Sequence, residues 1–127
     1  MFNDAVKYVP YEVGAAERDL NWASKSLSEH NEKWATLQAC SSVLHGARAL
    51  LLAKGYRGRT HFGLKTALQG HYADQGLLAQ SYVREFDKAM RLRQSAEYWY
   101  RLPHETAATA LDAAERFLER VKELLQR

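Results

Sequence analysis

Apolar residues recur along this chain at alternating spacings of three and four positions, which is the period of an amphipathic α-helix. The last quarter shows the pattern best, on the stripe formed by Ala107, Ala110, Ala114, Phe117, Val121 and Leu124. The pattern predicts four long helices, over residues 11–29, 32–54 and 77–101 and from Pro103 onward. A short helix is predicted from its N-cap, Thr60, to about Gly70.

Short connections join these segments, so neighbouring helices should run antiparallel. Both prolines of the chain, Pro10 and Pro103, lie where helices are expected to begin. Asn31 can cap the start of the helix over residues 32–54, and Gly55 can end it in the left-handed conformation. We therefore expect an all-α fold, an antiparallel up-and-down four-helix bundle with one extra short helix, formed as a single domain by residues 1–127.

The composition favours helices over sheets and excludes a membrane span. The 127 residues include 19 Ala and 17 Leu but only 6 Val and no Ile, and Leu and Ala favour helix whereas β-branched residues favour strands. The longest unbroken apolar run, residues 49–53, is far shorter than the ~20 residues that cross a bilayer. The first ten residues lack the long apolar core of a signal peptide. We expect a cytoplasmic protein.

The charge is mildly basic and has one local concentration. A net charge of +3 and a pI near 9.1 favour anionic partners. Lys54, Arg57 and Arg59 lie in a glycine-containing loop that runs into a helix N-terminus, where free backbone N–H groups favour phosphate. Tyr56 and His61 could stack on a base. The alternative is an ordinary solvated turn, since the Gly-Lys-Ser/Thr ending of a Walker motif is absent.

Arg48 is unexpected on the apolar stripe of its helix, where it could pair inside the bundle, grip an anionic ligand or lie at a dimer interface. It can pair inside the bundle with Glu85, which lies on the stripe of the helix over residues 77–101. It can instead grip an anionic ligand together with Arg93, because the two helices are expected to face each other. In that second case Arg48, Arg93 and the basic loop would line one cleft.

The sequence predicts no catalytic residue, no metal ligand and no cofactor. The five histidines are scattered, without His-Glu-x-x-His, His-x3-His or Glu-x-x-His spacing. The single cysteine, Cys40, cannot form an internal disulfide, and a buried, inert thiol is expected on the apolar side of its helix.

Several segments, in order and with matching spacing, resemble prokaryotic HEPN-domain proteins: residues 16–20, 33–39, 45–51, 55–57, 60–64, 92–98 and 113–120. The resemblance covers nearly the whole chain. It implies a helical bundle that usually dimerises. It also implies frequent partnership with a minimal nucleotidyltransferase, the pair often forming a toxin–antitoxin or related system.

Many members of that family are endoribonucleases that use an Arg-x4–6-His motif, which is absent from this chain. Arg57 and His61 are one residue too close, and the stretch from Arg93 to Tyr98 contains no histidine. Relatives also tend to carry paired tyrosines at the position of Cys40-Ser41. The ribonuclease activity is therefore not carried over to this chain.

These observations favour a non-catalytic module that binds nucleotide or RNA, pairs with a nucleotidyltransferase, or does both. The candidate binding residues are Arg48, His61, Arg93, Arg57 and Arg59. Two alternatives stay open. One is a metal-independent endoribonuclease that pairs Arg48 or Arg93 with His61, and the other is a purely structural dimeric bundle. Three tryptophans and seven tyrosines exceed what narrow Ala/Leu stripes can bury, which predicts a homodimer.

Overall fold

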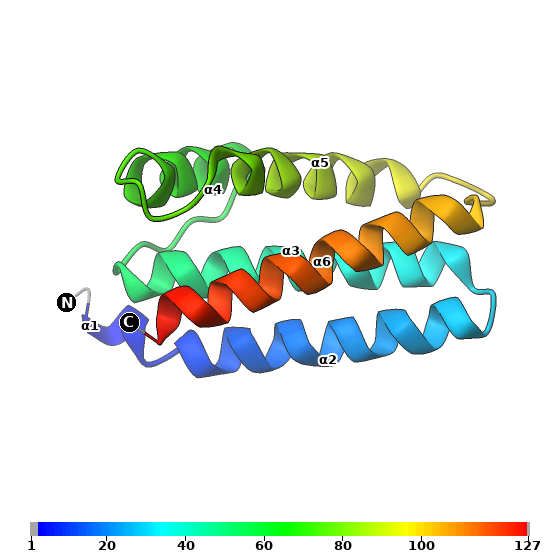
Figure 1. Ribbon diagram of the computed structural model, residues 1–127, viewed down its shortest axis with the longest axis horizontal. Helices are drawn as coiled ribbons and strands as arrows, with labels where there is room; N and C mark the ends of the chain where they lie inside the picture. Colours follow the sequence, from blue (N-terminus) through cyan, green and yellow to red (C-terminus); the bar gives the residue numbers. More distant parts are fainter. Residues whose placement is uncertain (1–2, 127) are drawn as a thin grey trace.

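The computed structural model describes residues 3–126 and contains only helical and irregular segments over that range (Figure 1). The elements are α1 (Asn3–Val6), α2 (Val9–Ser28), α3 (Glu32–Ala53), α4 (His61–Leu68), the π-helix η1 (Gln69–Ala73), α5 (Gln80–Ala96) and α6 (His104–Leu125). Consecutive long helices run in opposite directions (Figure 1). The predicted all-α fold class, with four long helices and a short one between the second and third of them, is confirmed.

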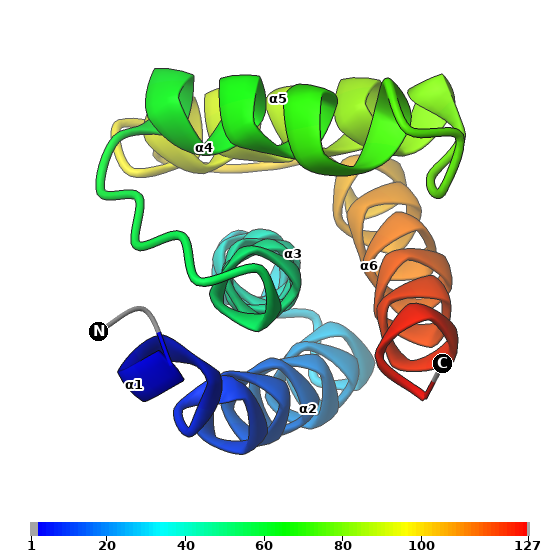
Figure 2. The same ribbon diagram turned by 90° about the vertical axis from the view of Figure 1, so that its left-hand side faces the viewer.

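Helix α3 lies at the centre of the bundle (Figure 2). Helix α2 covers one side, α6 the next, and α4 and α5 a third. The sides that face α2 and α6 carry small residues, which let the helices approach closely. At Gly46 an added Cβ would lie 3.4 Å from the Phe117 ring and from Val121 of α6. The core is completed by large buried side chains such as Leu50, Phe86 and Phe117.

Two of the predicted helix ends are confirmed in detail. The Thr60 side chain accepts a hydrogen bond of 2.9 Å from the backbone N–H of Gly63, which caps α4. Gly55 follows α3 with a φ of 81°, and its N–H donates to the carbonyl of Leu52. The next N–H, from Tyr56, donates to Leu51, which completes a left-handed helix end.

Other helix ends differ from the prediction. Asn31 stands at the N-cap of α3 but makes no capping bond with its side chain. Its N–H donates to the carbonyl of Ser26 instead, which closes the turn between α2 and α3. Helix α2 begins at Val9 rather than at residue 11, and the short helix α1 precedes it.

The connections on either side of α5 also differ from the prediction. Gly70 does not end the short helix, because the chain continues through η1. There Tyr72 is buried and its hydroxyl donates to the carbonyl of Leu50. Helix α5 ends at Ala96, five residues before the predicted Arg101, and the chain continues through an irregular segment in which Leu102 is buried ahead of Pro103. None of the helices over residues 3–126 has the length and apolar character to cross a bilayer.

The left-handed end of α3 predicts that an alanine substitution lowers stability at Gly55 but not at Gly70. Gly55→Ala places a Cβ at a φ of 81° and should lower the free energy of unfolding by about 1–2 kcal/mol. The control is Gly70→Ala, in which the added Cβ meets no atom within 4 Å and should leave stability within about 0.5 kcal/mol. Urea unfolding followed by circular dichroism measures both. Equal stability of the two variants would contradict this account of the turn.

Candidate functional site

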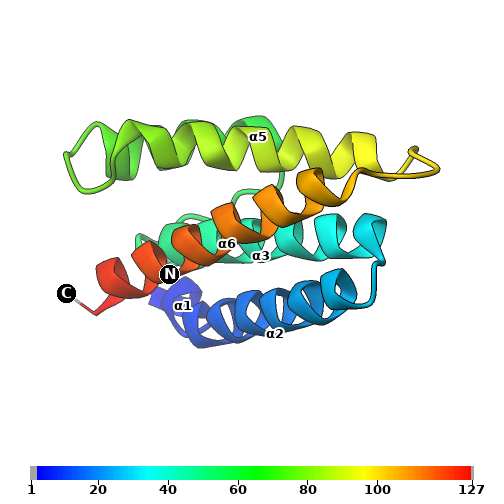
Figure 3. The ribbon, with the colours of Figure 1, turned by 45° about the vertical axis from the view of Figure 1, so that its right-hand side comes forward.

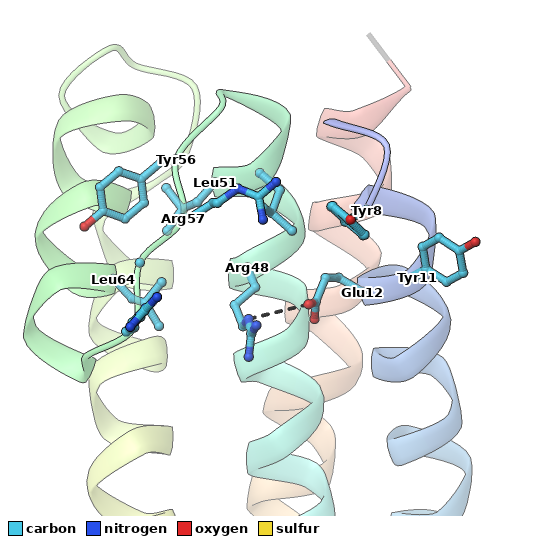
Figure 4. A pocket seen from close by; sticks show the side chains of 11 residues that line it. Tyr8, Tyr11, Glu12, Arg48, Leu51, Tyr56, Arg57 and Leu64 are labelled. Carbon is cyan, nitrogen blue, oxygen red and sulfur yellow. Dashed lines mark ion pairs between the residues drawn. The ribbon is translucent and has the colours of Figure 1, made fainter. Parts of the chain in front are cut away.

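A cavity of about 320 Å³ opens at the C-terminal end of α3, between α2 and the loop that leads to α4 (Figure 4). We call it the arginine pocket. Its lining residues come from three segments: Tyr8, Tyr11 and Glu12 beside or in α2, Arg48, Leu51 and Leu52 in α3, and Tyr56, Arg57, Gly58, Arg59 and Leu64 in or beyond the loop. Three guanidinium groups and one carboxylate give this lining an excess of positive charge.

The loop over residues 55–60 is positioned by close packing. Gly58 has no room for a side chain, because an added Cβ would lie 2.5 Å from the Tyr56 ring and 2.8 Å from Leu64. Arg57 extends from this loop over the Tyr8 ring, with its Cζ atom 5.2 Å from the ring centroid (Figure 4). This cation–π contact ties the loop to the start of α2 and holds one arginine at the rim of the pocket.

Arg48 pairs with α2 and not with α5. Its Nε atom lies 3.5 Å from Oε2 of Glu12, and 44% of its side chain is exposed (Figure 4). The predicted internal pair between Arg48 and Glu85 is therefore wrong. Glu85 lines a separate groove between α3, α5 and α6, together with Cys40. Arg48 lies beside α2 and is partly exposed, so its guanidinium group remains accessible.

Glu12 begins a row of polar contacts along the same flank of α3, between α2 and α5. Its Oε1 atom lies 2.6 Å from Nδ1 of His45, and the other ring nitrogen, Nε2, lies 3.6 Å from Oδ2 of Asp19. Burial raises the pKa of Asp19, while the charges of His45, Arg18 and Arg93 oppose that rise. We call the set Glu12, Asp19, Ser41, His45, Arg48 and Arg93 the flank network.

Arg93 reaches the flank network from α5. Its Nε atom donates to the hydroxyl of Ser41 at 3.3 Å. The position therefore agrees with the prediction that Arg93 faces α3. Arg93 is nevertheless absent from the lining of the arginine pocket, which lies at the end of α3.

His61 belongs to a different cluster. Its Nε2 atom lies 2.8 Å from Oδ1 of Asp87, and the same carboxylate contacts Lys65 and Arg91 at 3.4 and 3.0 Å. The hydrogen bond from Arg91 is the main cause that lowers the pKa of Asp87 to about 2, aided by His61 and Lys65. Of the five predicted binding residues, the structure brings Arg48, Arg57 and Arg59 into one pocket and leaves Arg93 and His61 outside it.

Sequence reasoning missed the α2 contribution to the site. Glu12 and Asp19 are seven residues apart and therefore share one face of α2, but nothing in their spacing identifies His45 as their partner. Tyr8 was missed because no helix was predicted before residue 11. Ser41 and Arg48 interrupt the apolar stripe of α3, and this interruption was the one signal of the flank network in the sequence.

Two further groups have side chains of a reactive or metal-binding type. Cys40 is buried, as expected, and burial raises the pKa of its thiol to about 12, which favours the protonated form. At the opposite end of the bundle His30, Glu32 and His104 approach one another. The sequence did not reveal this group because 72 residues separate Glu32 from His104 along the chain.

Comparison with known proteins gives two matches. The family model described as HEPN domain matches residues 13–124. A protein of Methanocaldococcus jannaschii named "Putative toxin MJ0605" is 31% identical over 116 residues, which cover 90% of this chain and 86% of that protein. The family match begins at Val13 within α2 and therefore includes most of the arginine pocket and all of the flank network except Glu12.

The lowered pKa of Asp87 predicts a pH-dependent contribution to stability. Because the folded-state pKa lies below the ordinary value of 3.8, the ionised group stabilises the fold above about pH 4. That contribution is lost as the pH falls towards 2. Asp87→Asn should lower the free energy of unfolding at pH 6 by about 1 kcal/mol, a figure limited by solvent screening of Lys65 and Arg91. The difference from the parent protein should shrink towards pH 2 and vanish below it.

The matched control is Asp112→Asn, which removes the carboxylate of another i, i+4 pair, with Arg116 at 3.1 Å, from a far more exposed site. Urea unfolding between pH 2 and 7 measures both variants. A pH profile of Asp87→Asn identical to that of Asp112→Asn would show that the Asp87 cluster does not stabilise the fold.

Proposed function

Because this chain belongs to the HEPN domain family, we propose that it is a helical module that binds the phosphate groups of nucleotide or RNA at the arginine pocket. The observation that carries the proposal is the convergence of Arg48, Arg57 and Arg59 on one cavity beside Tyr8 and Tyr11. Such a module would act in a toxin–antitoxin-like pair in the cytoplasm, in keeping with the named toxin of M. jannaschii that it resembles.

The chemistry of the pocket suits a phosphate next to a base. Guanidinium groups present donors in a planar fork that matches phosphate oxygens. Arg48 makes one contact of 3.5 Å to Glu12, which leaves most of its donors free for a ligand. Tyr11 is well exposed at the rim and offers a ring for stacking. The volume is at the lower end of the range for small-molecule sites.

We propose that this binding proceeds without cleavage. The Arg-x4–6-His motif is absent, and His61 is held by Asp87 away from the arginine pocket. One observation favours a second candidate, a metal-independent endoribonuclease. His45 lies 2.6 Å from Glu12, and Glu12 also contacts Arg48. A histidine oriented by a carboxylate beside an arginine can move protons during phosphodiester cleavage. His45 would then take the place that sequence reasoning gave to His61.

The proposal includes two protein partners. A nucleotidyltransferase is the partner that the HEPN resemblance implies. A second copy of this chain would cover the flank of α3 that neither α2 nor α5 closes. Exposed aromatic side chains support the second copy, because Trp34 of α3 is 55% exposed and Trp22 of α2 is 54% exposed.

Binding is tested with a labelled single-stranded RNA and with AMP, using fluorescence anisotropy and calorimetry. Arg48→Ala and Arg57→Ala should each weaken binding about tenfold, since one charge-assisted contact contributes about 1.5 kcal/mol. Added salt should weaken the RNA complex further. The control is Arg116→Ala, which removes an exposed arginine of α6 that lies outside the pocket. Affinities of the two pocket variants equal to that of the control would exclude the pocket as the binding site.

The same variants separate a ligand-binding Arg48 from a structural one. Glu12 keeps its contact with His45 when Arg48 is removed, so Arg48→Ala should cost no more than about 1 kcal/mol of stability.

A cleavage assay separates the binding module from the nuclease. End-labelled RNA incubated with the protein in EDTA should remain intact. Cleavage that disappears in His45→Ala and persists in His61→Ala would replace the binding proposal with the nuclease.

Self-association is tested by light scattering at micromolar concentration. The parent protein should give twice the monomer mass of 14.5 kDa. Trp34→Glu should return it to the monomer mass, because it buries a charge at the proposed contact. Thr109→Glu adds the same charge at an exposed position of α6 and should leave the dimer intact. A parent protein of 14.5 kDa would exclude the homodimer.

A further inference from the structure

Three side chains with metal-binding chemistry meet at the end of the bundle opposite the arginine pocket. His30 lies in the turn after α2, Glu32 begins α3, and His104 begins α6. Figure 3 shows the turn between α2 and α3 at the same end of the molecule as the start of α6. Oε2 of Glu32 lies 3.1 Å from Nδ1 of His104 and 3.8 Å from Nδ1 of His30.

The ligand atoms of the three residues are close enough for a single ion. One atom from each residue lies within 4.8 Å of the other two. Ligand atoms that bind zinc at about 2.0–2.2 Å in a tetrahedral arrangement are separated by roughly 3.5 Å, so a small closure of the side chains suffices. The His30 and His104 rings are tilted by 46°, with centroids 6.0 Å apart, and each turns a nitrogen to the same carboxylate.

The backbone at His30 has an unusual conformation. His30 has a φ of 59°, and over residues 3–126 it is the one non-glycine residue with positive φ. This conformation costs a residue with a Cβ about 1 kcal/mol, and Asn or Gly adopts it more readily. The strained turn places the imidazole beside the carboxylate of Glu32.

We propose that His30, Glu32 and His104 bind one divalent transition-metal ion of the zinc type. Two imidazoles and one carboxylate form a donor set that prefers such ions to Mg²⁺ or Ca²⁺ and leaves a coordination position open for water. The ion would join the turn after α2 to the start of α6. It would thereby fix the irregular segment over residues 97–103, which leads into α6.

Neighbouring positive charge lowers the expected affinity of this site for a metal ion. Arg101 and Lys33 line the same hollow, where the Nζ atom of Lys33 donates to the carbonyl of Glu97. Two helix N-termini also point towards the site and disfavour a cation. Binding in the micromolar range is therefore expected. The site shares no residue with the arginine pocket, so the two proposals stand or fall separately.

The test is calorimetric titration of the full chain, without a polyhistidine tag, with ZnCl2, together with the visible absorption spectrum of the Co²⁺ complex. One ion should bind per chain. His104→Ala and His30→Asn should each weaken binding at least about tenfold, and saturating Zn²⁺ should raise the Tm of the parent protein but of neither variant. His30→Asn suits the left-handed backbone and therefore keeps the turn folded.

The control is His71→Ala, which removes an exposed histidine of η1 outside this cluster and should bind Zn²⁺ as the parent does. Glu32→Gln replaces His104→Ala if circular dichroism shows that the latter is unfolded. No binding at 100-fold molar excess of Zn²⁺, or affinities of the ligand variants equal to that of His71→Ala, would overturn the proposal.

Discussion

The close packing of α3 against α2 and α6 decides where polar groups can lie in this bundle. Alanines and Gly46 bring the helices together on those two sides, and α4 and α5 cover a third. Charged side chains have no place on such surfaces, because burying an unpaired charge costs several kcal/mol. Ser41, His45 and Arg48 therefore lie on the remaining flank. The flank network and the arginine pocket follow from this enclosure.

The arginine pocket combines like charges that would repel one another without their present contacts. Arg48 is held by Glu12, and Arg57 lies against the Tyr8 ring. Each contact engages one part of a guanidinium group and leaves other donors directed to solvent. Arg48 and Arg57 are thus positioned before a ligand binds, which lowers the cost of ordering them around a phosphate bound as proposed. This positioning supports the proposed phosphate site over the alternative of an ordinary solvated turn.

Helix periodicity predicted which residues share a face, and this was sufficient for the fold. The stripes of α2, α3, α5 and α6, the cap at Thr60 and the left-handed Gly55 could all be predicted from local sequence. Periodicity does not determine which neighbouring helix a face meets. Arg48 was consequently assigned to Glu85 of α5, whereas it pairs with Glu12 of α2. The cluster of His30, Glu32 and His104 was invisible for a related reason, since 72 residues separate the latter two along the chain.

The π-helical turn η1 makes the position of Tyr72 depend on the number of residues in its segment. A π-turn holds one residue more than an α-turn, and Tyr72 lies within this turn. The tyrosine is buried, and its hydroxyl donates a hydrogen bond to the carbonyl of Leu50 in the last turn of α3. Deleting one residue of the turn before Tyr72 would rotate the tyrosine by about 100° around the helix axis and away from that carbonyl. This segment should therefore tolerate the substitution of exposed side chains better than the insertion or deletion of a residue.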